Sequence, residues 1–336
     1  SEMFTQRLLT WYDEHKRSLP WRGETDPYKI WVSEIILQQT RVQQGWDYYL
    51  LFIETFPTVE SLAKAQEEQV LRVWQGLGYY SRARNMHTAA QQIVELHQGI
   101  FPQQYDDIRK LKGIGDYTAA AIGSIAFGLP YPAVDGNVLR IISRIFGIFD
   151  DIATQKTRQK ITDICTKIID TQRPGDFNQA CMEFGATWCT PKNPQCTECP
   201  FLNQCYALQH GQVNTLPIKS NKISKRERYF VYTIYIYSNN TLLEQRTGKD
   251  IWKNLYQFPL LETDQQQYEQ IENYEYQLRE VLTHQIVHAK FIVETQCQSL
   301  KATNNQIIVP ISALNDYPMP KIMTEFLKSK DLYEQK

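Results

Sequence analysis

Four cysteines crowd into one short segment of the chain, and no other feature limits its fold as strongly. They are Cys189, Cys196, Cys199 and Cys205, whereas the other cysteines of this 336-residue chain are scattered. A disulfide scaffold would be short and rich in cysteine throughout, which this chain is not. Four thiols so close in sequence therefore predict a metal centre around which the chain turns tightly.

The spacing of these cysteines leaves more than one kind of site open. Four-cysteine zinc sites usually consist of two Cys-x-x-Cys pairs. Here only Cys196 and Cys199 form such a pair, with six residues before it and five after it up to the flanking cysteines. The pattern favours an iron–sulfur cluster, with zinc and unliganded cysteines as the alternatives.

Residues 1 to about 218 carry the apolar periodicity of helices. Asp26 and Pro27 are placed to begin a helix that runs through Glu34 and Leu37. Further helices are expected over residues 59–74, 81–96, 118–127, 138–146 and 157–170. The connections are short and often contain glycine, so this part is predicted to be an all-α bundle.

The chain changes character between Lys219 and Arg228, where five basic residues stand against one acidic residue. Such a basic run between differently patterned segments is typical of a linker. Beyond it we expect strands at 229–237 and 241–246 joined as a hairpin, a helix at 277–283, and strands at 289–295 and 307–311. The sequence therefore predicts an α+β domain over residues 229–336.

Composition excludes several classes of protein. With 42% hydrophobic and 22% charged residues the chain is neither disordered nor of low complexity. Its formal charge of −1 argues against a protein that binds nucleic acid through bulk charge. No segment resembles a transmembrane span or a signal peptide, so a cytosolic protein without a membrane partner is expected.

Two glycines, Gly113 and Gly115, separate two helical patterns and allow a tight turn. The amides that begin the next helix would then face outward as a phosphate site, beside Lys112. An ordinary connection between helices is the alternative. Asp135 follows in Val-Asp-Gly-Asn, where it can cap a helix, serve in a functional site, or do both.

The hairpin, this Val-Asp-Gly-Asn segment and the four cysteines together resemble the helix–hairpin–helix DNA glycosylases. Residues 19–22, 31–40 and 76–84 carry the resemblance further, to the adenine-specific MutY-type branch that acts on adenine paired with 8-oxoguanine. The resemblance implies a multidomain protein with an all-α helix–hairpin–helix core, an iron–sulfur lobe and an α+β Nudix-like C-terminal domain. The expected limits are 1–218 for the catalytic region (a six-helix lobe at about 20–134 and a cluster lobe from 1–19 plus 135–218), 219–228 for the linker and 229–336 for the Nudix-like domain.

The implied reaction is hydrolysis of the bond between adenine and deoxyribose. The leaving base must be protonated and an oxocarbenium-like sugar stabilised, which two carboxylates in opposite protonation states can do. The resemblance assigns these roles to Glu34 and Asp135. Apolar neighbours should raise the pKa of Glu34, and a helix N-terminus should favour the charged form of Asp135. Tyr117 and Asn137 match family positions that line the catalytic pocket.

Tyr117 separates this chain from bifunctional relatives, which resemble endonuclease III and carry a lysine nucleophile at this position. A phenol cannot form an imine, so a monofunctional glycosylase is expected. The alternatives are a bifunctional pyrimidine glycosylase/lyase and a non-enzymatic metal-containing DNA-binding module, which would leave Glu34 and Asp135 without a role.

The resemblance also implies the contacts with DNA, with Gln39 and Tyr79 as wedges that fill the space of an extruded base. Residues 282–284 are Leu282, Thr283 and His284, where the family has the Phe-Ser-His that reads 8-oxoguanine. A hydroxyl and the imidazole are therefore kept, and the phenyl ring of the phenylalanine is lost. The implied DNA-binding residues are Arg22, Leu37, Gln39, Thr40, Tyr79, Arg82, Lys112, Gly113 and Gly115.

The cofactor implied by the resemblance is a 4Fe-4S cluster on the four cysteines. A monovalent or divalent cation at the carbonyls of the Gly113–Gly115 hairpin is compatible with it. The expected partner is double-stranded DNA with A·8-oxoguanine or A·G mispairs, bound by a monomer at the nucleoid of a bacterial cytoplasm.

Overall fold

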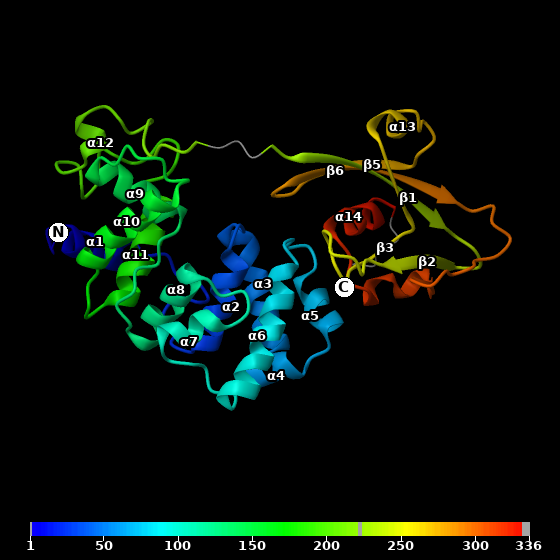
Figure 1. Cartoon of the computed structure of the whole chain (residues 1–336), viewed down its shortest axis with the longest axis horizontal. Helices are drawn as coiled ribbons and strands as arrows, with labels where there is room; N and C mark the ends of the chain where they lie inside the picture. The colour runs from blue at the N-terminus through cyan, green and yellow to red at the C-terminus, as the bar shows by residue number, and fades with distance from the viewer. Residues whose placement is uncertain (1, 221–223, 331–336) are drawn as a thin grey trace. The chain divides into compact units, whose positions relative to one another are not determined.

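The computed structural model describes residues 2–220 and 224–330, and the chain to residue 209 folds into helices (Figure 1). No helix among these residues is both long and apolar enough to cross a membrane. The helices are α1 (Glu2–His15), α2 (Pro27–Leu37), α3 (Val42–Thr55), α4 (Val59–Lys64), α5 (Glu67–Trp74), α6 (Ser81–His97), α7 (Tyr105–Lys110), α8 (Asp116–Phe127), α9 (Gly136–Phe146), α10 (Gln155–Ile168), α11 (Pro174–Thr187) and α12 (Tyr206–Gln209).

These helices confirm the expected all-α region, with one division that was not expected. The segment 59–74 forms two helices, because Gln66 leaves helical geometry and caps α5. The side chain of Gln66 accepts from the amide of Gln69, whose side chain accepts from the amide of Gln66 in return. Such a reciprocal box ends one helix and starts the next.

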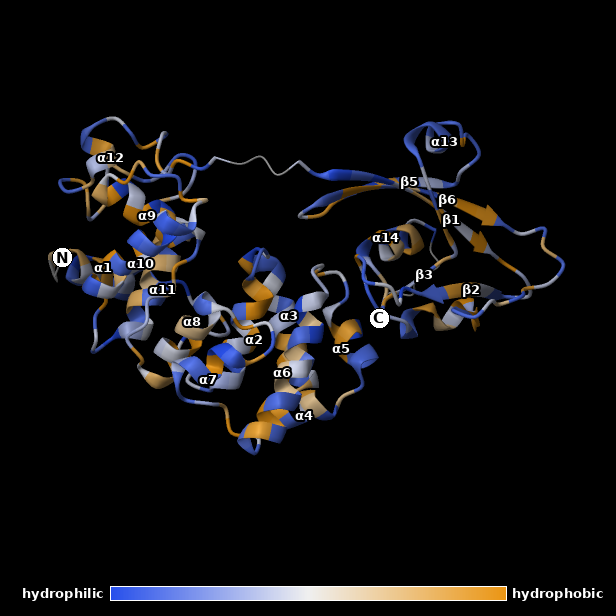
Figure 2. Cartoon of the chain, viewed as in Figure 1, coloured by the Kyte–Doolittle hydropathy of each residue, from blue (hydrophilic) through white to orange (hydrophobic). Residues whose placement is uncertain are grey.

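Buried apolar side chains hold the helices together, and hydrophobic and hydrophilic residues alternate along the helices (Figure 2). Helices α1, α9, α10 and α11 share a core that includes Leu8, Ile141 and Phe184, all fully buried. Helix α2 packs against both α3 and α8 and buries Trp31 completely. Burial of one such side chain stabilises the fold by about 2 kcal/mol, so α2 is held firmly in place.

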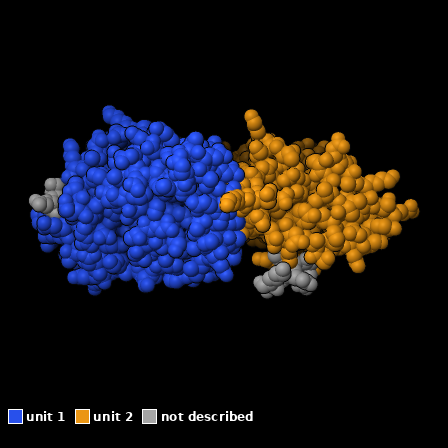
Figure 3. All heavy atoms as spheres, turned by 90° about the horizontal axis from the view of Figure 1, so that it is seen from below, with its two compact units in different colours: residues 1–63, 88–221 blue, residues 64–87, 222–336 orange. Residues whose placement is uncertain are grey.

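Contacts divide the chain into two units (Figure 3). Unit 1 comprises residues 1–63 and 88–221, and unit 2 comprises residues 64–87 and 222–336. Residues 64–87 are fastened to the rest of unit 2 by hydrogen bonds. The hydroxyl of Tyr80 donates to the carbonyl of Met319 at 3.1 Å, and Arg84 donates to the carbonyl of Lys253 at 2.8 Å.

The C-terminal part of unit 2 contains two sheets. The four-stranded sheet has the order β4-β1-β6-β5, with β1 and β6 parallel and the other pairs antiparallel; the three-stranded antiparallel sheet has the order β3-β2-β7. Helix α14 covers the larger sheet, and the ring of Phe326 stacks on Phe291 at 4.5 Å. The elements are β1 (Arg226–Tyr235), β2 (Asn240–Gln245), β3 (Tyr256–Gln257), β4 (Leu260–Thr263), α13 (Gln265–Glu269), β5 (Tyr276–Val281), β6 (Gln285–Glu294), β7 (Gln306–Pro310), a 3₁₀ helix (Ile311–Asp316) and α14 (Lys321–Ser329).

Two expectations for this part were wrong. Residues 277–283 are not helical, because 276–281 form β5, whose side chains alternate between half-buried and exposed as a strand requires. The hairpin between β1 and β2 has its tight turn at Ser238 and Asn239, both with positive φ, but the strands separate after it. Strand β1 is already paired on both edges by β4 and β6, so β2 joins the other sheet.

Candidate active site

One pocket of unit 1 brings together side chains from α2, α8, α9 and α11. Glu34, Tyr117, Asp135 and Asn137 line it, as the sequence predicted. Four of the expected DNA-binding residues line the same pocket: Arg22, Leu37, Gln39 and Thr40.

Glu34 projects into this pocket from α2, whose start is fixed by local sequence. Asp26 accepts the amide of Tyr28 at 2.9 Å, and Pro27 occupies the first turn. Burial raises the pKa of the Glu34 carboxyl to about 7, with the charge of Asp135 adding to the effect and the hydroxyl of Tyr117 and the charge of Arg22 opposing it. The expected direction is confirmed, and Glu34 can carry a proton near neutral pH.

Asp135 caps α9, as expected. One of its oxygens accepts the amide of Val138 at 2.9 Å, and the other accepts the Asn137 side chain at 2.9 Å. The expectation that the helix N-terminus would favour the charged form is wrong in its net effect. Burial raises the pKa of Asp135, although these hydrogen bonds and Arg140 oppose the rise. Desolvation of the carboxylate outweighs the helix end here.

Asn137 is held in place by α11 and by a buried arginine. Arg140 donates to the side-chain oxygen Oδ1 of Asn137 at 2.8 Å and to the backbone carbonyl of Gly185 at 2.7 Å. Gly185 is required for this approach, because a Cβ there would lie 2.5 Å from the Cβ of Asn137. The amide of Asn137 is thus directed at Asp135 by its surroundings.

A buried carboxylate also lines the pocket. Glu183, whose side chain is 3% exposed, accepts from Arg17 Nε at 2.6 Å and from Arg22 Nη2 at 2.9 Å. Burial opposes ionisation of Glu183, but these two arginines outweigh it and its pKa lies below the ordinary value. Arg22 also donates to Tyr12 at 2.6 Å, so its guanidinium is held rigidly at the pocket.

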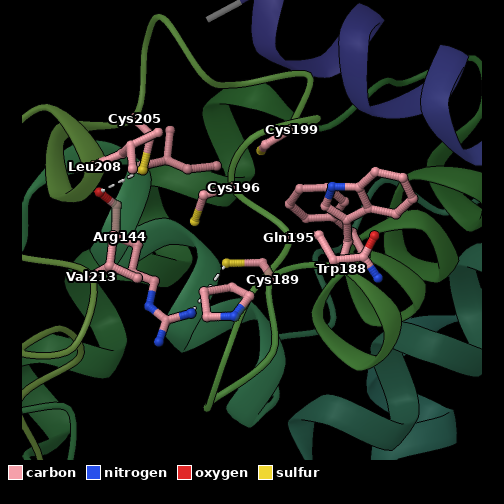
Figure 4. A pocket seen from close by; sticks show the side chains of 12 residues that line it. Arg144, Trp188, Cys189, Gln195, Cys196, Cys199, Cys205, Leu208 and Val213 are labelled. Atoms are coloured by element: carbon pink, nitrogen blue, oxygen red, sulfur yellow. Dashed lines mark hydrogen bonds between the residues drawn. The ribbon is translucent and has the colours of Figure 1, made fainter.

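The four clustered cysteines line a second cavity of unit 1, and their sulfurs turn toward it (Figure 4). Arg144 Nη1 lies 3.5 Å from the sulfur of Cys189, and the amide of Phe201 lies 3.4 Å from the sulfur of Cys199. Among the described residues no three His, Cys, Asp or Glu side chains are grouped closely enough to bind one metal ion. No cysteine in the part of the chain that the structure describes forms a disulfide.

The glycine hairpin lies between α7 and α8, as predicted. Gly113 has φ of 76°, a conformation that favours glycine, and Gly115 is the residue that precedes the first turn of α8. Lys112 is exposed, and its amide donates to the side chain of Gln92 at 2.8 Å. The hairpin residues are not among those lining the pocket around Glu34.

The remaining expected site residues belong to unit 2. Tyr79 is 40% exposed, and the guanidinium of Arg82 lies 5.2 Å above its ring. Residues 282–284 form the turn between β5 and β6, where the hydroxyl of Thr283 donates to the hydroxyl of Tyr79 at 3.0 Å. Both expected wedge residues have positive φ, 56° at Gln39 and 52° at Tyr79. Such backbone strain in a non-glycine residue is often found at functional sites.

Sequence reasoning missed several residues that line the pocket around Glu34. Among these, Gln179, Met182 and Glu183 recur at helical spacing on α11. Arg17 also lines the pocket and is bound to Glu183. The sequence signal that was missed is a stripe of Gln179, Met182 and Glu183 at helical spacing, on a helix that also carries core residues such as Phe184.

Comparison with known proteins adds to this geometry. A family model described as HhH-GPD superfamily base excision DNA repair protein matches residues 32–167, and a NUDIX domain model matches residues 231–329. An adenine DNA glycosylase of Buchnera aphidicola subsp. Schizaphis graminum (strain Sg) is 38% identical over 262 residues, 78% of this chain and 76% of that protein. The human adenine DNA glycosylase is 43% identical over 222 residues, 63% of this chain and 41% of the human protein. A solved thermostable thymine-DNA glycosylase has a TM-score of 0.57 at 26% identity, covering 62% of this chain and 95% of the other.

Proposed function

Because the chain belongs to the adenine DNA glycosylases, we propose that it removes adenine paired with 8-oxoguanine or guanine, as a monomer bound to double-stranded DNA. The family consists of base excision repair enzymes that hydrolyse N-glycosidic bonds, and this chain is such an enzyme. The observation that carries the proposal is the placement of Glu34 and Asp135, two carboxylates in different environments, on one pocket.

In the proposed mechanism Glu34 is the general acid. Its raised pKa keeps a proton available near neutral pH, and transfer of that proton to a ring nitrogen of adenine makes the base a better leaving group. Asp135 is the second carboxylate, which stabilises the developing positive charge on the sugar or captures it covalently. Asn137 donates to Asp135 and so fixes the position of that carboxylate.

Tyr117 supports a monofunctional enzyme. Its hydroxyl oxygen lies at hydrogen-bond distance, 3.0 Å, from Glu34 Oε2, and a phenol has no amine with which to form an imine at the sugar. We therefore propose that the enzyme releases adenine and leaves the strand uncut.

For the DNA we propose two sets of contacts. Lys112, Gly113 and Gly115 bind phosphate at the hairpin, where exposed backbone precedes α8. Gln39 and Tyr79, both strained, fill the space of the extruded base, and Thr283 and His284 read 8-oxoguanine with Leu282 beside them. The remaining contacts of this proposal are Arg22, Leu37, Thr40 and Arg82.

We propose further that Cys189, Cys196, Cys199 and Cys205 hold a 4Fe-4S cluster. Four sulfurs face one cavity, and the nearby guanidinium of Arg144 can stabilise thiolate charge. Because no three of the described side chains are grouped closely enough for a single ion, the arrangement supports a larger group, such as a cluster, over one zinc ion. A bound cluster would cross-link the segment 189–205 and lies in a different cavity from Glu34, so no step of the reaction passes through it. We also propose that the backbone carbonyls of the Gly113–Gly115 hairpin bind a monovalent or divalent cation.

Product analysis on short duplexes tests the function. We expect adenine release from A·8-oxoguanine and A·G duplexes, strand cleavage only after alkali, and no borohydride-trapped adduct. Glu34→Gln and Asp135→Asn should reduce single-turnover release at least 100-fold while duplex binding is kept. Near-normal release by either variant would refute its assigned role, and cleavage without alkali would indicate a lyase.

A further inference from the structure

The hydroxyl of Tyr117 lies between two side chains that come from different helices. Its oxygen is 3.0 Å from Glu34 Oε2 on α2 and 2.8 Å from the thioether sulfur of Met182 on α11. Met182 lines the same pocket as the two carboxylates. A thioether has no hydrogen to donate and can only accept, weakly. Met182 is thus an acceptor directed at a tyrosine that contacts the general acid.

The protonation states of Glu34 and Tyr117 decide whether both contacts of the tyrosine hydroxyl can be hydrogen bonds. Burial raises the pKa of Tyr117 well above 10, so the phenol keeps its single hydrogen. When Glu34 is ionised, that hydrogen can go either to the carboxylate or to the sulfur, and one contact is left unmade. Both contacts are hydrogen bonds at the same time only when Glu34 is protonated and donates to the tyrosine oxygen, while Tyr117 donates to Met182.

We propose that Met182 is a positioning residue for the reaction, which keeps the proton of Glu34 in place by accepting the hydroxyl hydrogen of Tyr117. The inference rests on the proposed role of Glu34 as general acid. In this proposal the general acid is part of a chain of hydrogen bonds, which runs from Glu34 through the hydroxyl of Tyr117 to the sulfur of Met182.

The charged groups around Glu34 do not accept the hydroxyl hydrogen of Tyr117 in place of Met182. Asp135, at the N-terminus of α9, favours the protonated form of Glu34 through its charge, and Arg22 favours the ionised form. Glu183 on α11 lines the pocket but is neutralised by Arg17 and Arg22. Without an acceptor at position 182, Glu34 is the remaining hydrogen-bond partner of the tyrosine hydroxyl among the residues that the structure describes. It would then stabilise the carboxylate that the reaction needs in its protonated state.

The test is the pH profile of single-turnover adenine release for Met182→Leu, which keeps the volume and removes the acceptor. We expect the alkaline limb of the profile to move down by about half a pH unit, the effect of one weak hydrogen bond, so that release is roughly threefold slower above the limb. On the acidic side of the limb the rate should equal that of the unchanged enzyme. Met182→Gln restores an acceptor oxygen and should return the limb to its original position.

A Tyr117→Phe background separates this role from simple packing. With the hydroxyl gone, Met182→Leu should displace the limb no further, and melting curves check that each variant is folded. A uniform loss of rate at every pH, an unmoved limb, or a shift that persists without the hydroxyl would overturn the inference. Failure of the unchanged enzyme to release adenine, or full activity of Glu34→Gln, would instead refute the proposed function itself.

Discussion

At the scale of residues, Glu183 is a buried charge that two arginines hold at the pocket. It is buried and accepts hydrogen bonds from two arginines, and its pKa is lowered in the folded protein. Glu183→Gln leaves both guanidinium groups with a neutral partner and should cost about 2 kcal/mol at pH 7, less than for a fully buried pair because Arg17 is partly exposed. Urea or thermal unfolding of both proteins measures this difference.

The same difference should depend on pH in a defined direction. A carboxyl whose pKa is lower in the folded than in the unfolded state contributes stability above the unfolded value, and this is lost as the pH falls through the folded value. The gap between the two proteins should therefore close in acid. Asp13→Asn is the matched control, because Asp13 pairs with Arg173 at the surface and should matter much less. Equal losses in both variants would contradict the argument.

At the scale of elements, the segment that carries the four cysteines has little regular structure, so the cluster proposed above would be expected to hold it together. Cys199→Ala should therefore lose iron and the brown visible absorption together, and the segment 189–205 should become sensitive to protease. Metal analysis and absorption spectra check this, with Cys297→Ala in unit 2 as the control that keeps both. A colourless protein that contains zinc would contradict the cluster.

Elements differ in how far they could be predicted. The starts of α2 and α9 were predictable because Asp26 and Asp135 bond to amides two or three residues away, so the neighbouring sequence contains the whole interaction. Strand β2 was predicted as a strand, but its pairing was not, because its partner β7 lies far along the chain. Strand β5 was mistaken for a helix although its partner β6 is the next strand along the chain. The alternating pattern of residues 276–281 was a local signal for β5 that a helical reading overlooked.

The site shows the same division between local and distant information. Glu34 and Asp135 could be proposed because each stands in a recognisable motif. The contact between Met182 and Tyr117 could not be proposed, because the two residues are 65 positions apart in the sequence and the packing of α11 brings them together. The net direction of the Asp135 pKa also required the structure, since burial cannot be read from a helix cap alone.

For the whole molecule, a formal charge of −1 means that affinity for DNA must come from a few local contacts. Each lysine that neutralises a phosphate releases counterions, so the logarithm of the binding constant should fall linearly with the logarithm of salt concentration. Lys112→Ala should reduce this slope by about one, as expected for one phosphate contact. Fluorescence anisotropy of labelled duplexes over a salt series measures the slope.

The control is Lys167→Ala, an exposed lysine on α10 that is not part of the proposed DNA contacts. It should leave the slope unchanged although it alters the total charge by the same amount. Because phosphate contacts carry no base information, Lys112→Ala should weaken binding equally to duplexes with A·8-oxoguanine and with matched pairs. A loss confined to the mispaired duplex would mean that Lys112 takes part in reading the lesion. An equal effect of both lysines would mean that total charge, and not its placement at the hairpin, governs binding.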